Sequence, residues 1–284
     1  MIKALKKFRW ACWELVAKVL ARSYIVGPEL EDAIQAFRRM AKAGTASTIC
    51  YWNVEEDSPA LVAAAYGRAI EALGQEKADG YLSIKAPALH MDRTLHRQVA
   101  EHAREKGIRL HFDALALEVT DDTFSLISDL LPLQPTIGCT LPGRWRRSPA
   151  DADWAVERGL RVRVVKGQWV DPSWPEADLR EGFLAVIDRL AGRAVHVAVA
   201  THDAPLAREA LARLRKKNTP CELELLYGLP LKPARQAAQE AGVNVRMYLP
   251  YGHGWVPYCI SQVYQRPGIL WWVLKDLLVS AERR

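Results

Sequence analysis

Residues 195–200 read VHVAVA, a run of small and β-branched apolar residues that a single histidine interrupts. A strand with one face in water alternates apolar with polar residues, so this run predicts a strand covered on both faces, as in a parallel sheet. Thr201 and His202 follow it, and then DAPLAREALARLRKK, a stretch with helical periodicity. A buried strand that leads directly into an amphipathic helix is the repeating unit of α/β folds.

Seven further apolar, β-branched or aromatic runs are separated by helical stretches such as PALVAAAYGRAIEALG. With 195–201 as the sixth in chain order, the runs are 45–52, 80–85, 108–113, 136–141, 162–166, 221–227 and 243–248. Eight strand-then-helix units in about 240 residues predict an α/β protein of the (β/α)8 TIM-barrel type. The alternative, a doubly wound open sheet, usually carries a GxGxxG turn, which this sequence lacks.

Helical periodicity before the first strand, over residues 3–22 and 28–43, predicts an N-terminal helical lead-in. We therefore divide the chain into a lead-in over 1–43 and a catalytic barrel over 44–284, within a single domain overall. The first helix is basic and carries two tryptophans, and its charges leave it too polar for a membrane span or a signal core. It either docks on its own domain or lies on a membrane surface.

The composition is that of an ordinary globular protein, with half of its 284 residues hydrophobic and a quarter charged, which excludes general disorder. A net charge of +6 favours anionic small molecules or surfaces, and without an RNP1-like run or a Cys/His finger it does not predict nucleic-acid binding. The five cysteines are scattered and form no CxxC, which argues against a zinc ribbon and a disulfide scaffold. We expect a protein of a reducing compartment, the cytoplasm.

The residues that end the predicted strands are the candidate site residues, because active sites of such barrels lie at the carboxyl ends of the strands. Lys85 follows YLSI and has three open roles, namely Schiff-base formation, pairing with an anion, or orientation by Asp113. Its pairing with Asp113 could also be purely structural. Arg163 and Lys166, followed by Gly167, suit a phosphate or another acidic group, unless Lys166 is simply a solvated strand end.

The junction after residues 195–201 predicts that Thr201 or Asp203 caps the next helix, whose N-terminus would attract an anion near His202. The histidines and carboxylates show no metal-ligand spacing, so no metal site is predicted, and GxSxG and P-loop motifs are absent. Tyr248, Tyr251 and Tyr258 suit the wall of a pocket for a flat ring or small heterocycle, because their hydroxyl groups need partners.

These motifs resemble the flavin-dependent proline dehydrogenases, a family of distorted (β/α)8 barrels that bind FAD. The matching segments run in the family's order over nearly the whole chain. They are the lead-in ARSYIVGPELEDAIQAFRRMAKAG and then YLSIKAPAL, RVRVVKGQW, VATHD, ELLYGLP and RMYLPYGHGWVPY.

The resemblance implies hydride transfer from the carbon next to the ring nitrogen of the substrate to the flavin. It implies that Lys85 lies beside the substrate carboxylate and the flavin, and that Asp113 orients this lysine. The FAD-binding residues it implies are Arg163, Lys166, Gly167, Gln168, Thr201 and His202. The substrate-binding positions it implies are Leu226, Tyr248, Tyr258, Ser261 and Gln262.

The sequence departs from the family where the substrate carboxylate would bind. Ser261 and Gln262 stand at the positions of two arginines that clamp this carboxylate in the family. Neutral side chains do not replace charge-assisted hydrogen bonds worth roughly 1.5–3 kcal/mol each. We therefore expect a proline-like or cyclic amine whose carboxylate is absent, masked as an amide or ester, or bound elsewhere by Arg144 or Arg146. Trp169 also replaces a family tyrosine.

Four functions remain open on the sequence. The first two are a flavoenzyme that oxidises the C–N bond of a modified or non-proline amine, and a proline dehydrogenase with a relocated carboxylate site. The other two are a Schiff-base lyase that uses Lys85 or Lys166, and a non-catalytic barrel. In the family the electron acceptor is often a membrane quinone, which would suit a cytoplasmic protein whose basic first helix touches the membrane surface.

Overall fold

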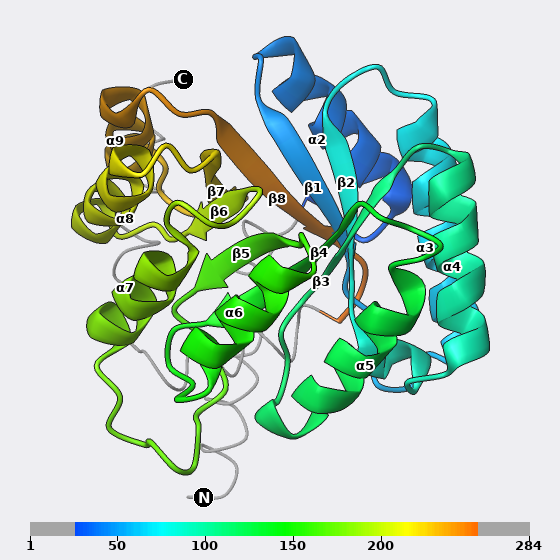
Figure 1. Cartoon of the computed structure of the whole chain (residues 1–284). Coiled ribbons are helices and arrows are strands. Elements are labelled where there is room, and N and C mark those ends of the chain that lie inside the picture. Colours follow the sequence, from blue (N-terminus) through cyan, green and yellow to red (C-terminus); the bar gives the residue numbers. More distant parts are fainter. Residues whose placement is uncertain (1–25, 255–284) are drawn as a thin grey trace, which may run out of the picture.

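The computed structural model describes residues 26–254, and residues 1–25 and 255–284 lie outside the described part. Within it, eight parallel strands form a closed barrel in chain order, with β8 paired to β1 (Figure 1). The strands are β1 (Ala46–Tyr51), β2 (Gly80–Ile84), β3 (Arg109–Phe112), β4 (Ile137–Pro142), β5 (Arg161–Val165), β6 (Val197–Ala200), β7 (Cys221–Leu226) and β8 (Val245–Tyr251). The predicted (β/α)8 barrel is confirmed.

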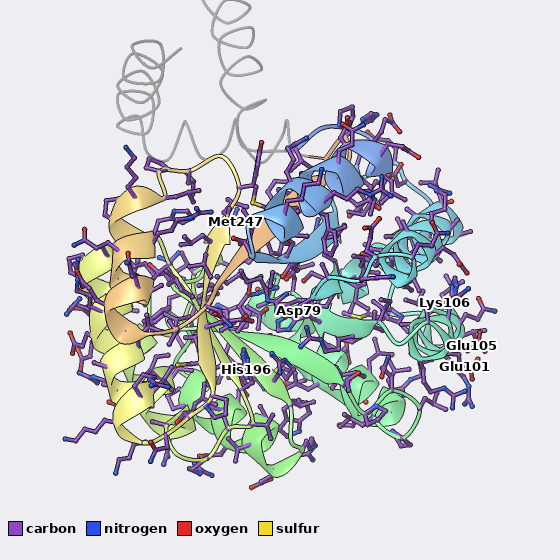
Figure 2. All side chains as sticks on the ribbon, turned by 90° about the horizontal axis from the view of Figure 1, so that it is seen from above. Asp79, Glu101, Glu105, Lys106, His196 and Met247 are labelled. Atoms are coloured by element: carbon purple, nitrogen blue, oxygen red, sulfur yellow. The ribbon has the colours of Figure 1, made fainter. Side chains whose placement is uncertain are left out.

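Helices follow the strands and surround the barrel (Figure 1). They are α2 (Leu30–Lys42), α3 (Pro59–Gly74), α4 (Arg93–Glu105), α5 (Thr120–Leu130), α6 (Ser148–Glu157), α7 (Leu179–Leu190), α8 (Ala204–Lys216) and α9 (Lys232–Ala241), with 3-10 turns η1 (Ala86–Leu89) and η2 (Leu117–Val119). In the view from above, Asp79 and His196 lie toward the middle of the molecule, whereas Glu101, Glu105 and Lys106 lie at its outer edge (Figure 2).

Several helices begin at a side chain that accepts hydrogen bonds from otherwise unpaired backbone N–H groups. Asp203 accepts a hydrogen bond from the N–H of Leu206 at the start of α8, as the sequence predicts, and Asp92 and Asp178 cap α4 and α7 in the same way. Each of these helices follows a strand in the chain, so its N-terminus lies on the side of the barrel where that strand ends. The carboxyl ends of the strands are therefore surrounded by helix N-termini.

The outer faces of the strands and the inner faces of the helices form the hydrophobic core. Ile49, Leu82, Leu110 and Val164 are buried against helices, which is why the runs that predicted the strands are so apolar. Strand β8 continues three residues beyond its predicted end at Tyr248, because it pairs with β1 as far as Tyr251.

The inside of the barrel is polar, unlike the layers of branched apolar residues that fill many barrels of this type. Hydrogen bonds between strands that are not neighbours, such as Thr48 of β1 with Glu224 of β7, cross the interior. Further buried polar side chains on the strands include Ser83, His111, Thr140, Arg163, Glu222 and Arg246. A polar interior supplies charges that reach the mouth at the carboxyl ends of the strands.

The predicted second N-terminal helix is confirmed as α2, which contacts β1 and β8. The predicted helix over 3–22 lies outside the described residues, so the proposed lead-in boundary at residue 43 stays a prediction. Among residues 26–254, no helix has the length and apolar character that a membrane span requires.

Candidate active site

Arg163 is the centre of a hydrogen-bonded network inside the upper half of the barrel, toward the carboxyl ends of the strands. Its guanidinium is buried and binds Glu224 through two bonds, from Nε at 2.7 Å and from Nη2 at 3.0 Å. Nη1 donates to Asp113 Oδ1 at 2.5 Å. The guanidinium also donates to Ser83, Thr140 and Tyr81. We call Arg163, Glu224, Asp113 and these three partners the upper network.

The neighbours of Arg163 in the upper network keep its guanidinium charged. Burial alone would favour a neutral Arg163, but Glu224, Tyr81 and Asp113 raise the pKa of the guanidinium well above its ordinary value. Burial, together with the charge of Glu224, raises the pKa of Tyr81 to about 12. His111 stacks on Tyr81, and burial and the Arg163 charge keep its pKa well below the ordinary value.

Asp113 connects the upper network to the mouth of the barrel. Its Oδ1 accepts from Ser83 Oγ at 2.7 Å, and its Oδ2 accepts from Tyr248 Oη at 2.7 Å. The Cys50 thiol lies 3.5 Å from the same Oδ2, and burial, followed by the charge of Asp113, raises the pKa of this thiol to about 12. Asp113 thus fixes the hydroxyl of Tyr248 and faces a thiol that stays protonated.

Lys85 lies at the mouth, one residue after the end of β2. Its Nζ lies 5.4 Å from the centre of the Trp52 ring, within the range of a cation–π interaction. Its backbone N–H donates to the hydroxyl of Tyr66, a fully buried side chain of α3. Within residues 26–254, the Lys85 ammonium forms no ion pair, so the structural salt bridge with Asp113 that the sequence left open does not form there.

Arg163 and Lys166 do not share one ligand position, contrary to the sequence-based prediction. Arg163 binds inside the barrel, whereas Lys166 Nζ pairs with Asp203 Oδ2 at 2.8 Å and is 38% exposed. This bond lowers the pKa of Asp203 and outweighs the opposite effect of burial. Two residues that are three positions apart on a strand face opposite sides, which the spacing argument overlooked.

Gly167 begins the loop that leaves β5 at the mouth. Its φ is +92°, and an added Cβ would lie 2.7 Å from Pro142 Cβ, so conformation and space both require glycine. Arg144 donates to the carbonyl oxygen of Gln168 at 2.8 Å, and Trp145 Nε1 donates to that of Trp169 at 2.9 Å. These two side chains, which follow β4, hold the backbone of this loop.

Thr201 and His202 follow β6, and both are engaged by the protein. Thr201 is buried and accepts from the N–H of Asp203. His202 Nε2 accepts from the N–H of Leu226 at 2.9 Å, which leaves Nδ1 to donate to the carbonyl oxygen of Pro230 at 3.1 Å. Burial lowers the pKa of His202, so the neutral ring connects β6 to the end of β7.

The structure describes only some of the predicted substrate-binding residues. Leu226 ends β7 and pairs in register with Tyr248 of β8, so both lie at the mouth. Burial, followed by the charge of Asp113, raises the pKa of Tyr248 well above its ordinary value, so its hydroxyl stays a donor. Tyr258, Ser261 and Gln262 lie outside the described residues.

The sequence reasoning missed several residues of the site. Glu224 was the clearest omission, since its alternation with Glu222 in ELELL indicates two carboxylates on one face of a strand. Tyr81 and Ser83 alternate with Lys85 in the same way. Each was read only as part of an apolar run, although a buried carboxylate needs a cation close by.

A small pocket lies on the outer side of the barrel wall, beside Asp113. It has a volume of about 280 Å³, including open space at its mouth, and lies between the ends of β3 and β4 and helix α5. Its lining is mainly apolar and includes Phe112, Phe124 and Trp145. Among the residues described, no group of three or more His, Cys, Asp or Glu side chains could hold a metal ion.

Comparison with characterised proteins finds similarity to proline dehydrogenases, although no family model matches the chain. It is 25% identical over 276 residues to proline dehydrogenase 1 of Bacillus subtilis subsp. natto, covering 91% of this chain and 90% of that protein. It is 26% identical over 282 residues to the proline dehydrogenase of Deinococcus radiodurans, again covering 91% and 90%.

Solved structures share the fold at lower identity. Proline utilization A (PutA) of Bdellovibrio bacteriovorus, inactivated by N-propargylglycine, aligns over 88% of this chain with a TM-score of 0.76 and 18% identity. PutA of Corynebacterium freiburgense aligns over 90% with a TM-score of 0.70 and 17% identity. The chain spans 33% and 32% of the lengths of these two PutA chains. The chain therefore resembles proline dehydrogenases over about nine-tenths of its length, and it shares the barrel fold of these PutA chains.

Proposed function

We propose that the protein is a flavin-dependent oxidoreductase that removes a hydride from the carbon beside the nitrogen of a proline-like cyclic amine. As the C–H bond breaks, the nitrogen lone pair forms the C=N bond of the product. The nitrogen must therefore react in its unprotonated form. The relatives named proline dehydrogenase support this reaction class, and the rim of the barrel supplies the residues for it.

The mouth of the barrel fits a flavin on two structural observations. Gly167 packs against Pro142 at a φ of +92°, which only glycine tolerates there, so the loop after β5 stays close to the strand ends at the mouth. Lys85 brings a cation to the same mouth, and a cation stabilises the negative charge that a flavin ring gains on reduction. When bound, FAD supplies the hydride acceptor. Lys166, Gly167, Gln168 and Thr201 are the residues proposed to hold it.

Arg163 and His202 are proposed to act on the cofactor only through their neighbours. The N–H groups of Arg163 are directed at side chains of the upper network, and both ring nitrogens of His202 are bonded to backbone groups. This revises the roles that the resemblance implies for these two residues. His202 shapes the mouth by fixing the end of β7 at Leu226.

The residues proposed to meet the substrate are Lys85, Tyr248 and Leu226. Tyr248 is fixed through its 2.7 Å bond to Asp113, so its ring is held as one wall of the pocket. Leu226 adds an apolar wall on the neighbouring strand. These side chains exclude water and orient the ring, and positioning of this kind accounts for much of the rate of hydride transfer.

The substrate is proposed to lack a free carboxylate, or to carry it as an amide or ester. Ser261 and Gln262 offer no positive charge at the family's clamp positions. Arg144 donates hydrogen bonds to the carbonyl oxygens of Gly167 and Gln168, so it is less available to bind a substrate carboxylate in place of the two arginines. The side chain of Arg146 is exposed, while its backbone N–H donates to Asp171.

The observation that carries the proposal is the ammonium of Lys85 at the mouth, with no ion pair within residues 26–254 and above a charged network that leads to Tyr248. A structural lysine would be expected to pair with Asp113, which is on the adjacent strand. Asp113 instead binds Arg163, Ser83 and Tyr248. The lysine therefore remains available to a bound group.

A substrate screen on the purified protein tests the proposal. Absorbance near 450 nm, about where oxidised flavins absorb, is expected after FAD is added and excess is removed. Anaerobic bleaching of this band is then followed with pyrrolidine, L-prolinamide, L-proline methyl ester and L-proline. Bleaching by the first three, and slow bleaching by proline, supports the proposal. Efficient turnover of proline would instead establish a proline dehydrogenase with a relocated carboxylate site.

The electron acceptor is proposed to be a quinone, with the protein acting in the cytoplasm and at the membrane surface. The relatives support a small-molecule substrate, and the basic character of residues 3–22 supports the membrane contact. Reoxidation of the substrate-bleached protein by a soluble quinone, compared with reoxidation by oxygen, tests this acceptor. Sedimentation with anionic vesicles tests the membrane contact.

A further inference from the structure

Glu224 changes the charge balance of the mouth, although it lies one layer below the rim. It is 3% exposed and accepts two bonds from Arg163, one from Thr48 at 2.8 Å, and bonds from Tyr81. An arginine has five N–H groups, and in Arg163 they are directed at side chains of the protein. The guanidinium of Arg163 therefore has its hydrogen-bond donors engaged by protein side chains and not by a ligand.

Four charged side chains of the upper barrel, two cations and two anions, sum to zero net charge. Lys85 and Arg163 are the cations, and Asp113 and Glu224 are the anions. Lys166 and Asp203 form a separate pair. Without the charge of Glu224 the same set would carry a net positive charge, which is what an anionic substrate requires.

Amine oxidation distinguishes two kinds of substrate by charge. The nitrogen must be unprotonated to form the C=N bond, so the reacting form of proline carries one negative charge from its carboxylate. The reacting form of prolinamide carries none. A set of side chains with no net charge favours the second kind, because it attracts an anion less strongly than a set with a net positive charge.

We propose that Glu224 is a specificity-determining residue that neutralises Arg163 and thereby directs the site toward cyclic amines without a carboxylate. This inference rests on the proposed function and adds the substrate class of the same site. Glu224 touches neither substrate nor cofactor in this scheme, and it acts through Arg163 and Asp113. The same residue would otherwise be a plain structural partner of a buried arginine.

The chain contains a matched control on the same strand. Glu222 is also buried, at 5% exposed, and binds Arg246 Nε at 2.8 Å in the lower half of the barrel. Glu222→Gln and Glu224→Gln remove the same charge from the same strand at different distances from the mouth. A purely structural role predicts similar consequences for both variants.

The experiment compares kcat/KM for L-proline and L-prolinamide in the FAD-loaded wild type and the two variants. Glu224→Gln is expected to shift the ratio toward proline about fivefold, the size of effect that one unit charge exerts through a partly screened interior. Glu222→Gln is expected to shift it less than about twofold, because its charge lies farther away. Equal shifts in the two variants, or no shift in Glu224→Gln, would overturn the inference.

A binding measurement makes the test independent of turnover and of FAD. Tetrahydrofuran-2-carboxylate and its carboxamide have the shape of the substrates but no nitrogen to oxidise, and calorimetry gives their Kd ratio. Glu224→Gln is expected to tighten the carboxylate about fivefold relative to the carboxamide. Failure of the wild type to bind the carboxamide would overturn the inference. If this ratio shifts while no amine bleaches the flavin, the proposed function fails and the charge effect stands.

A double variant covers the case in which Glu224→Gln does not fold. Arg163→Met with Glu224→Gln removes one charge of each sign, so the mouth keeps the wild-type balance. Its proline-to-prolinamide ratio and its Kd ratio are expected within about twofold of the wild type. A shift toward the carboxylate in this variant, as large as that expected for Glu224→Gln, would contradict the charge argument.

Discussion

Each half of the barrel interior contains a buried arginine bonded to two carboxylates, but the two networks differ in what lies beside them. In the lower half, Arg246 binds Glu222 and Asp79, and Asp79 also binds Arg109, which together we call the lower network. The upper network likewise joins Arg163 to two carboxylates. The difference is at the edge, because the upper network ends in Asp113 and Tyr248 beneath Lys85, an ammonium without an ion pair in the described part. The lower network pairs its charges internally, whereas the upper network lies beside a cation that has no ion pair within residues 26–254.

Removing Arg163 is expected to produce the largest loss of stability. Arg163→Met leaves Asp113 and Glu224 as two buried carboxylates without their shared cation, and breaking a buried pair in this way costs about 3–5 kcal/mol. Arg246→Met is expected to cost less, because Asp79 is 54% exposed and can be solvated. Urea unfolding of both variants measures the difference. Equal losses would show that the two networks do not differ in burial as described.

Removing Lys85 is expected to affect turnover far more than folding. Lys85→Met should lower kcat/KM for the best amine about 100-fold or more, because a charge aimed at the reacting groups is lost. Its melting temperature should stay within about 2 °C of the wild type, since the described part shows no ion pair to break. Lys166→Met, at a residue proposed to hold FAD, is the comparison. Its kcat/KM for the same amine is expected to fall by less than about tenfold. A stability loss in Lys85→Met as large as its activity loss would contradict this division of roles.

Gly167 tests the shape of the mouth separately from its charge. Gly167→Ala places a Cβ 2.7 Å from Pro142 at a φ of +92°, so we expect a loss of about 2–3 kcal/mol together with weaker FAD binding. Gly159→Ala is the matched control, because its φ is also positive, at +64°, but nothing lies within 4 Å of the added atom. It should lose about 1 kcal/mol and keep its FAD affinity. The comparison is read from denaturant unfolding and FAD titration, and equal effects would remove the argument from close packing.

Buried histidines in both halves of the barrel predict that the free energy of unfolding decreases on mild acidification. Burial, with nearby arginines, lowers the pKa of His196 to about 3 and that of His111 well below 6.5. The unfolded chain binds protons below pH 6.5 that the folded chain does not, so stability is lost as the pH falls through 6.5. At pH 5.5 each such histidine should lose about 1.4 kcal/mol relative to high pH. His196→Asn should remove the contribution of one histidine to the pH dependence of the free energy of unfolding. The same pH dependence in this variant and the wild type between pH 7.5 and 5.5 would contradict the prediction.

The fold was accessible from the sequence because each strand of the barrel is buried on its outer face by helices. The apolar runs and their helical separators predicted all eight strands. The position of Lys85, Asp113 and Lys166 at the carboxyl ends followed from this alone, since each comes one residue after a strand end. The hydrogen-bond and ion-pair partners of these residues could not be predicted from the sequence, because strands that are distant in sequence meet across the barrel interior.

Arg163 illustrates this limit. The sequence shows an arginine before Lys166 on one strand, and this suggested a joint phosphate site. The barrel instead turns Arg163 inward to Glu224 of β7 and Asp113 of β3, and turns Lys166 toward Asp203. His202 likewise was a candidate ligand residue in sequence and is a connector between β6 and β7 in the structure.

The sequence by itself determined the (β/α)8 barrel and the barrel rim on which charged residues gather, because periodicity and residue type are local properties. Only the tertiary structure decided which charges neutralise one another. Closure of the barrel brings Glu224 within 3.0 Å of Arg163 across 61 residues of sequence, and in a buried interior such proximity decides which ions remain available to a ligand.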